Sequence, residues 1–158
     1  MRLALYQPDI PQNAGAMLRL AACFGLGVDF ILPAGFVLDD ARMRRAGMDY
    51  IDHVEIARHS SWSAYREARR HDEGRLLLLT TQGDTPYTDF TFEAEDTLLV
   101  GRESGGVPID VHDAADARLV IPMQPGLRSL NVAMAAAIVA GEAMRQIKAA
   151  GKQERRAS

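Results

Sequence analysis

Residues 97–108 read TLLVGRESGGVP, an apolar run followed directly by a glycine-rich loop. Such a run is typical of a strand buried on both faces in a parallel sheet. The pattern recurs at residues 119–131, LVIPMQPGLRSLN, where a short apolar run precedes a loop that contains proline and glycine. Open α/β sheets bind ligands at the C-terminal ends of their strands. The sequence therefore predicts an α/β fold whose ligand site is formed by these two loops.

The rest of the chain alternates between apolar runs and stretches of helical pattern. Strands are predicted at Leu3 to Tyr6, Val28 to Leu32, Leu76 to Thr80, Thr97 to Val100 and Leu119 to Ile121. Helices are predicted at Ala14 to Phe24, Asp39 to Ala46, Ser61 to His71, Asp110 to Ala115 and Leu130 to Ala149. We therefore expect a three-layer α/β domain with a mainly parallel sheet.

Length and composition are those of one globular domain. The chain has 158 residues, of which 47% are hydrophobic and 25% charged. We expect a single domain over residues 1–152 and a disordered tail over residues 153–158. The single cysteine, Cys23, cannot form an internal disulfide. The longest apolar stretch, residues 132–141, is too short for a membrane helix, so the expected location is the cytoplasm.

Charge and missing motifs exclude several classes of function. The net charge of −3 predicts that any nucleic-acid contact is confined to a local patch. The sequence lacks GxGxxG after the first strand, GxxxxGK[ST], HExxH and GxSxG, which disfavours dinucleotide oxidoreductases, P-loop enzymes and serine hydrolases. The histidines are scattered without the spacing of metal ligands, so no metal site is expected.

Two predicted helices carry informative patterns. The first has an apolar face at helical spacing, with Arg19 nearly opposite to it. Gly15, one turn before Arg19, leaves room for a ligand to approach the guanidinium. By itself, this pattern favours an ordinary solvated arginine at position 19. Residues 130–140 are apolar around the whole helix, which predicts a central helix or a subunit interface.

The two loops offer backbone groups and a few polar side chains. Their glycines and prolines fix tight turns that expose N–H and C=O groups, which can bind an adenine or a ribose. Glu103 can accept hydrogen bonds, or it can be an exposed turn residue. Ser129 and Asn131 begin the last predicted helix, where a serine is also a common N-cap.

Three segments together resemble the three motifs of the SPOUT RNA methyltransferases, over nearly the whole chain. They are Tyr6-Gln7-Pro8 through Asn13-Ala14-Gly15 and Arg19, Gly101-x-Glu103-x-x-Gly106-x-Pro108, and Ile121-Pro122-Met123 leading to Ser129-Leu130-Asn131. Within that superfamily, the absence of an appended RNA-binding domain and the stretch Arg44 to Tyr50 resemble one branch. That branch methylates the ribose 2′-oxygen of the tRNA wobble nucleotide.

The resemblance implies a deep trefoil knot in the C-terminal part of the sheet, a homodimer, and S-adenosylmethionine bound among the knot loops without a metal. The residues that it implies as cofactor contacts are Leu79, Gly101, Glu103, Ile121, Met123, Ser129 and Leu130. It implies Arg19, Asn13 and Asn131 as the residues that act on the reacting ribose, and Arg44 and Arg45 as RNA contacts. The implied partner is the anticodon stem-loop of tRNA.

The function with most support is therefore S-adenosylmethionine-dependent 2′-O-methylation of a cytidine or modified uridine at the wobble position. One alternative is 2′-O-methylation at another site of tRNA or rRNA. A second is a nucleotide- or RNA-binding module without chemistry. A third is an enzyme of flavodoxin-like architecture with a flavin or a phosphorylated ligand.

Overall fold

The computed structural model describes residues 1–37, 49–69 and 74–157. Within these residues, one parallel sheet has the strand order β3-β2-β1-β6-β4-β7-β5. The strands are β1 (Arg2–Tyr6), β2 (Gly27–Ile31), β3 (Ile56–His59), β4 (Leu76–Leu79), β5 (Thr85–Pro86), β6 (Thr97–Val100) and β7 (Ala117–Val120). The helices are α1 (Pro11–Phe24), α3 (Trp62–Ala68), α4 (Ile109–Asp113) and α5 (Val132–Ala157), with short 3-10 helices η1 (Asp49–His53) and η2 (Tyr87–Asp89).

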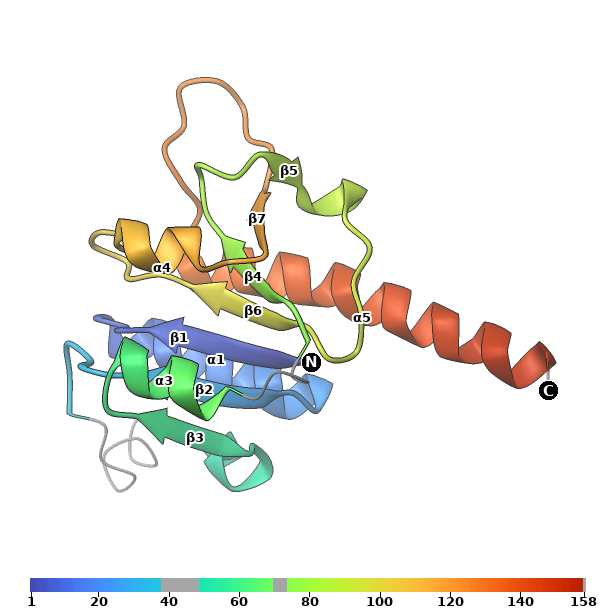
Figure 1. Ribbon diagram of the computed structural model, residues 1–158, viewed down its shortest axis with the longest axis horizontal. Helices are drawn as coiled ribbons and strands as arrows, with labels where there is room; N and C mark the ends of the chain where they lie inside the picture. Colours follow the sequence, from blue (N-terminus) through green and yellow to red (C-terminus); the bar gives the residue numbers. More distant parts are fainter. Residues whose placement is uncertain (38–48, 70–73, 158) are drawn as a thin grey trace.

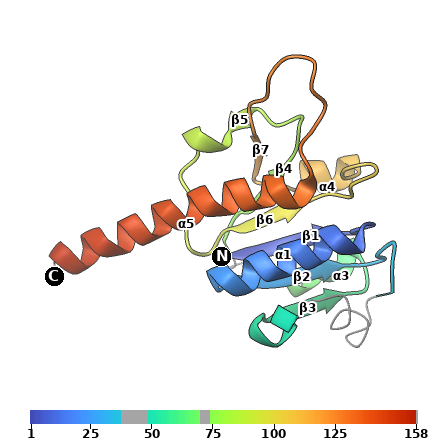
Figure 2. The same cartoon turned by 180° about the vertical axis from the view of Figure 1, so that it is seen from behind.

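Helices cover both faces of the sheet (Figures 1 and 2). On one face, α1 and α5 contribute Met17 and Val139 to the larger of two apolar cores. On the other face, α3 and α4 contribute Tyr65 and Val111 to the second core. β6 is buried along its whole length because it lies between these two layers. The predicted three-layer α/β fold is confirmed.

All strands predicted from apolar runs are present, but the sequence does not predict β3 or β5. Both lie at the edges of the sheet. β3 has the sequence Ile-Ala-Arg-His and is only partly buried, so it lacks an apolar run. β5 has two residues, and its Pro86 cannot donate to a ladder, which is tolerated at an edge.

Helix ends differ more from the prediction. α1 begins at Pro11 rather than Ala14, since proline is well suited to the first turn of a helix. α5 continues to Ala157 and extends past the sheet (Figures 1 and 2), so the predicted end at Ala149 is wrong. Residues 153–157, expected in a disordered tail, continue this helix because glutamine, glutamate, arginine and alanine favour helix. The predicted helix Asp39 to Ala46 lies outside the described residues.

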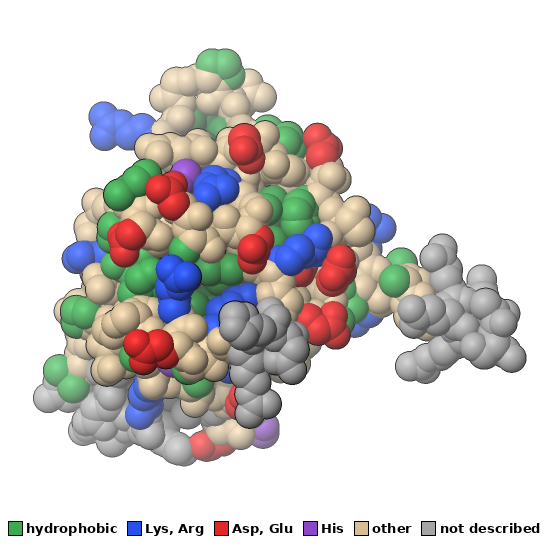
Figure 3. Space-filling model, in the orientation of Figure 1, with side chains coloured by type: hydrophobic (Ala, Val, Ile, Leu, Met, Phe, Trp, Pro, Cys, Tyr) green, Lys and Arg blue, Asp and Glu red, His purple; other side chains and the backbone are tan. Residues whose placement is uncertain are grey.

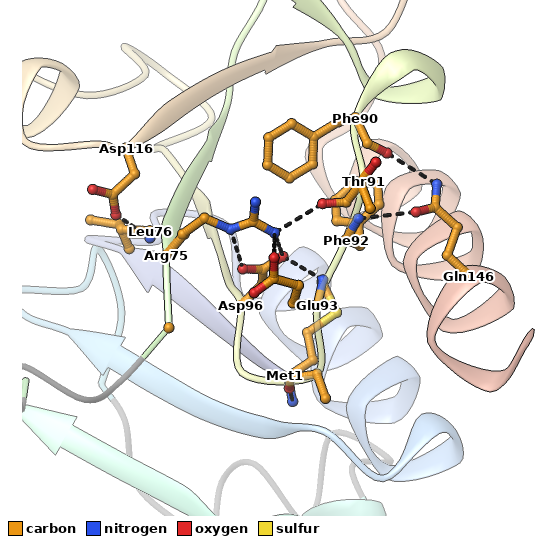
Figure 4. A network of polar contacts seen from close by, with 12 residues as sticks. Met1, Arg75, Leu76, Phe90, Thr91, Phe92, Glu93, Asp96, Asp116 and Gln146 are labelled. Carbon is orange, nitrogen blue, oxygen red and sulfur yellow. Dashed lines mark hydrogen bonds and ion pairs between the residues drawn. The ribbon is translucent and has the colours of Figure 1, made fainter. Parts of the chain in front are cut away.

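A buried ion pair fixes the segment that precedes β6, at the amino end of the sheet (Figure 4). Asp96 is fully buried, and its carboxylate accepts hydrogen bonds from Arg75 Nε at 2.9 Å and from the Glu93 N–H at 2.8 Å. A second guanidinium nitrogen of Arg75 lies 2.8 Å from the same carboxylate. Nearby, Gln146 of α5 accepts the Phe92 N–H at 3.0 Å. The segment therefore joins α5 to the sheet.

The substitution Asp96→Asn should lower the free energy of unfolding by about 2 kcal/mol, because it removes the charge of a buried carboxylate that accepts hydrogen bonds from Arg75 and from the Glu93 N–H. Urea denaturation followed by circular dichroism measures this loss. Glu93→Gln is the matched control, since that carboxylate is 62% exposed and 3.5 Å from Arg75; its expected cost is below about 1 kcal/mol. Equal losses in the two variants would contradict the assignment.

Candidate functional site

The C-terminal ends of four strands meet at one edge of the sheet. Parallel pairing places Leu5 of β1 beside Val100 of β6, and Leu79 of β4 beside both Val100 and Leu119 of β7. The loops that follow these strands surround a cavity of about 500 Å³. The loops 101–107 and 121–131, predicted from the sequence to form one site, therefore face the same cavity.

The cavity collects the residues expected to contact a cofactor, which are Leu79, Gly101, Glu103, Ile121, Met123, Ser129 and Leu130. It also includes Thr80 and Thr81, which the sequence analysis missed although they directly follow β4. Ile10 and Ala135 line it too, and no sequence signal points to them. They reach the cavity because α1 and α5 pack side by side on the sheet. Cofactor contact by these residues stays a prediction.

The loop after β6 closes into a tight turn. The N–H groups of Arg102 and Gly106 each donate to the other residue's C=O at 2.9 Å. Gly106 has a φ of +65°, which side chains disfavour. A Cβ atom on Gly101 would lie 2.6 Å from the carbonyl carbon of Gly106. Glycine at position 101 is therefore required by the turn itself, before any ligand binds.

Asp9 and Glu103 each accept a hydrogen bond from the other's backbone. The Glu103 N–H donates to Asp9 Oδ1 at 3.1 Å, and the Asp9 N–H donates to Glu103 Oε2 at 3.0 Å. The Ser104 N–H donates to Asp9 Oδ2 at 3.3 Å, and the Ser104 hydroxyl donates to the same oxygen. The hydrogen bonds from Glu103 and Ser104 hold the pKa of the Asp9 carboxyl well below its usual range.

Two asparagines link Glu103 to the start of α5. Asn131 Oδ1 accepts the N–H groups of Ala133 at 2.9 Å and Met134 at 3.2 Å, so Asn131 caps the helix. Its amide nitrogen donates to Asn13 Oδ1 at 2.9 Å, and the Asn13 amide nitrogen donates to Glu103 Oε1 at 2.9 Å. Both amides in this hydrogen-bond chain have one orientation. Asn131 must accept at Oδ1 to cap α5, and Asn13 must donate from its amide nitrogen to the Glu103 carboxylate.

Arg19, the third predicted catalytic residue, does not line this cavity. It borders a shallower hollow of about 410 Å³ between α1 and α5, which Asn13 and Asn131 also line. Its guanidinium donates to the Tyr50 hydroxyl at 3.3 Å and lies 4.7 Å from the centroid of that ring. The sequence analysis did not identify Tyr50 as a partner of Arg19, because only the packing of η1 on α1 brings them together.

Arg44 and Arg45, predicted as RNA contacts, fall outside the described residues. Within residues 1–37, 49–69 and 74–157, no group of three or more His, Cys, Asp or Glu side chains is arranged to hold a metal ion. In the same ranges, none of the helices combines the length and apolar character of a bilayer-spanning segment.

Solved structures with this architecture share a methyltransferase description. One, described as giving insight into "2-OH methylation of C/U34 on tRNA", superposes with a TM-score of 0.85 at 41% identity over 92% of this chain and 94% of its own. A SpoU methyltransferase from Streptomyces viridochromogenes, solved in complex with the cofactor AdoMet, gives a TM-score of 0.82 at 28% identity over 92% of this chain and 57% of its own.

The sequence comparisons agree with the structural ones. A tRNA (cytidine(34)-2′-O)-methyltransferase of Beijerinckia indica is 59% identical over 95% of this chain and 94% of its own length. The Escherichia coli K12 protein of the same description is 38% identical over 93% and 94%. Residues 1–141 also match the SpoU rRNA methylase family. With both loops of the cavity inside that match, this chain belongs to the SpoU rRNA methylase family.

Proposed function

We propose that this chain is an S-adenosylmethionine-dependent methyltransferase that modifies the ribose 2′-oxygen of nucleotide 34, the wobble nucleotide of tRNA. The observation that carries the proposal is the cavity at the strand ends, with the Glu103-Asn13-Asn131 chain in its wall. The relatives that are named for this reaction match the chain along nearly its full length. The relatives are named for cytidine 34 and the solved structure for C/U34, which supports a pyrimidine as the acceptor base.

The cavity suits S-adenosylmethionine in size and lining. Its volume of about 500 Å³ falls within the roughly 300–1,000 Å³ typical of small-molecule sites. Leu79, Ile121 and Leu130 supply apolar surface for the adenine, and the loop backbones supply donors and acceptors for the ribose and amino acid groups. When bound, the cofactor supplies a methyl group on a positively charged sulfur, so we assign no metal to the reaction.

The polar side chains have distinct tasks in this proposal. A ribose hydroxyl is a poor nucleophile until its proton is leaving, so the site must orient it and stabilise negative charge. Asn13 and Asn131 each use one amide N–H in the hydrogen bonds that link Asn131, Asn13 and Glu103. The second N–H of either amide can orient the ribose. The guanidinium of Arg19 stays protonated, so we assign it to the adjacent phosphate and the developing alkoxide rather than to proton removal.

Arg19 does not line the cavity of its own chain, so its assigned role in this proposal requires a second chain. The surface between α1 and α5 exposes apolar side chains, with Met134 59% and Ile138 38% exposed. Phe24 at the end of α1 is 36% exposed. A face of this kind becomes buried in a two-fold dimer, the commonest closed assembly. We therefore propose a homodimer in which Arg19 of one chain lies near the cavity of the other.

We also assign the tRNA-binding surface to the face of the molecule that carries the proposed dimer interface. On the α3 and α4 face, acidic and basic side chains of the described residues are interspersed, without a continuous basic surface (Figure 3). That distribution argues against this face as the tRNA-binding surface.

The trefoil knot is part of the proposal as well. It is supported by the course of α5, which leaves the loop after β7 and returns across β6 to pack on α1.

The decisive experiment maps ribose methylation in tRNA from cells with and without the gene, and repeats the reaction with purified protein and S-adenosylmethionine. Loss of the 2′-O-methyl group at nucleotide 34 supports the proposal. Loss at another tRNA or rRNA nucleotide overturns the assignment of the site. Cofactor binding without methyl transfer would favour a binding module, and a yellow, flavin-containing protein would favour the flavodoxin-like alternative.

Gly101→Ala should weaken S-adenosylmethionine binding about tenfold or more, equal to about 1.4 kcal/mol. The new Cβ would collide with the Gly106 backbone and open the turn that lines the cavity. Isothermal titration calorimetry measures the dissociation constant. Gly141→Ala is the matched control, because a Cβ there meets no atom within 4 Å and the residue does not line the cavity. Unchanged affinity for Gly101→Ala would remove the turn from the binding site.

Mixed dimers test whether Arg19 acts on the partner's cavity. Arg19→Ala and Asn131→Ala should each abolish most turnover as homodimers. When the two variants are unfolded together and refolded, random pairing makes half of the dimers mixed. If Arg19 acts on the partner's cavity, each mixed dimer has one of its two sites with both residues intact, so about a quarter of all sites should regain activity. Arg19→Lys should rescue little, because an ammonium cannot replace the planar fork. Absence of recovery in the mixture would place Arg19 in its own subunit's site.

A further inference from the structure

The segment between β1 and α1 lies directly beside the turn that follows β6. Because Leu5 and Val100 are register partners, residues 7–10 and 101–104 leave the sheet next to each other. Gln7 has a φ of +44°, a left-handed conformation that is unfavourable for a residue with a side chain. Such a conformation persists only where neighbouring contacts determine it. The Gln7 N–H donates to the Ile31 carbonyl at 2.8 Å, and the contacts of Asp9, two residues further on, hold the next part of the segment.

Asp9 is held by two segments of the chain. Its carboxylate accepts three hydrogen bonds, all of them from Glu103 and Ser104 of the turn, and its side chain is only 17% exposed. Asp9 also lies against Gly35, where a Cβ would lie 2.8 Å from both the Cα and the Cβ of Asp9. The Gly35 N–H also donates to the Pro8 carbonyl at 2.9 Å. Asp9 therefore packs closely against residue 35 as well as against the turn.

We infer that Asp9 is a positioning residue that holds the turn 102–106 in the conformation that binds S-adenosylmethionine. The inference rests on the proposed function. Asp9 does not line the cavity, whereas Glu103 and Ser104, whose backbone it binds, do. It therefore acts through the turn and not by contact with the cofactor. No sequence feature distinguishes it from an ordinary loop aspartate.

The two carboxylates of this contact control different parts of the site. The Asp9 carboxylate holds the backbone of the turn, and the Glu103 carboxylate holds Asn13, which orients Asn131. A change of the Asp9 side chain leaves the Asp9 N–H in place, so the bond from that N–H to Glu103 survives. Loss of the Asp9 carboxylate should therefore weaken cofactor binding more than it slows turnover at saturating cofactor.

The test compares Asp9→Asn with Asp113→Asn in the full chain. The control removes the same charge from a carboxylate that is 69% exposed and contacts His112 rather than the turn. Asp9→Asn should raise the dissociation constant of S-adenosylmethionine about tenfold, with the turnover number at saturating cofactor within about threefold of the parent. Asp113→Asn should leave both quantities unchanged. Asp9→Glu, which keeps the charge, should recover most of the affinity.

Hydrogen exchange gives a second readout that does not depend on activity. Without Asp9's carboxylate, the amides of Glu103 and Ser104 should exchange faster in the peptide that covers the turn, while peptides from β1 and β6 keep their parental protection. Parental affinity and parental exchange in Asp9→Asn would overturn the inference. So would an equal loss of affinity in Asp113→Asn, or a fall in turnover larger than the loss of affinity.

A third variant keeps the test decisive if Asp9→Asn does not fold. Ser104→Ala removes one donor to the Asp9 carboxylate and should weaken cofactor binding about threefold with faster exchange of the turn; parental values for both would overturn the inference. The affinity and exchange measurements use cofactor without tRNA, and only the turnover number requires tRNA. Failure of the parent to methylate nucleotide 34 would therefore contradict the proposed function alone, and parental binding by the Asp9 variants would contradict this inference alone.

Discussion

The parallel pairing of β1 with β6 is the constraint on which the site depends. It joins the first strand of the chain to one that begins more than ninety residues later, at Thr97. Because the two strands run in the same direction, the segments that follow them emerge at the same edge. All contacts among Asp9, Asn13 and Glu103 are possible only in this register, since a shift by one residue would turn their side chains to other neighbours.

Given that register, the hydrogen bonds around the cavity form one directed chain. It starts at the N–H groups of Ala133 and Met134 in the first turn of α5, which donate to Asn131. It passes through Asn131 and Asn13, and it ends on the Glu103 carboxylate. A chain whose members each have one orientation presents its remaining donors in fixed directions. Fixed donors cost no reorganisation when charge develops during a reaction, which is the main source of electrostatic catalysis. In the proposed function, this packing prepares the site before a substrate arrives.

The sequence predicts the parts of this molecule that depend on local pattern. Apolar runs locate every strand of the sheet interior, and the loop composition after β6 and β7 identifies the cavity. The sequence does not predict the edge strands of the sheet or the side-chain contacts that strand register and helix packing create. β3 and β5 need little apolar surface because each has one neighbour, so no run marks them. Asp9 and Tyr50 acquire their partners from elements distant in the sequence, and no spacing rule connects Asp9 with Glu103 or Tyr50 with Arg19.

Helix α5 begins at the cavity and ends outside the body of the subunit (Figure 1). Its 26 residues form a rod of about 39 Å at 1.5 Å per residue. The core holds this rod along its first half, and Gln146 still bonds Phe90 and Phe92. The 11 residues after Gln146, about 16 Å at 1.5 Å per residue, extend past this anchor. This end of the helix therefore offers a neighbouring molecule a surface away from the body of the subunit.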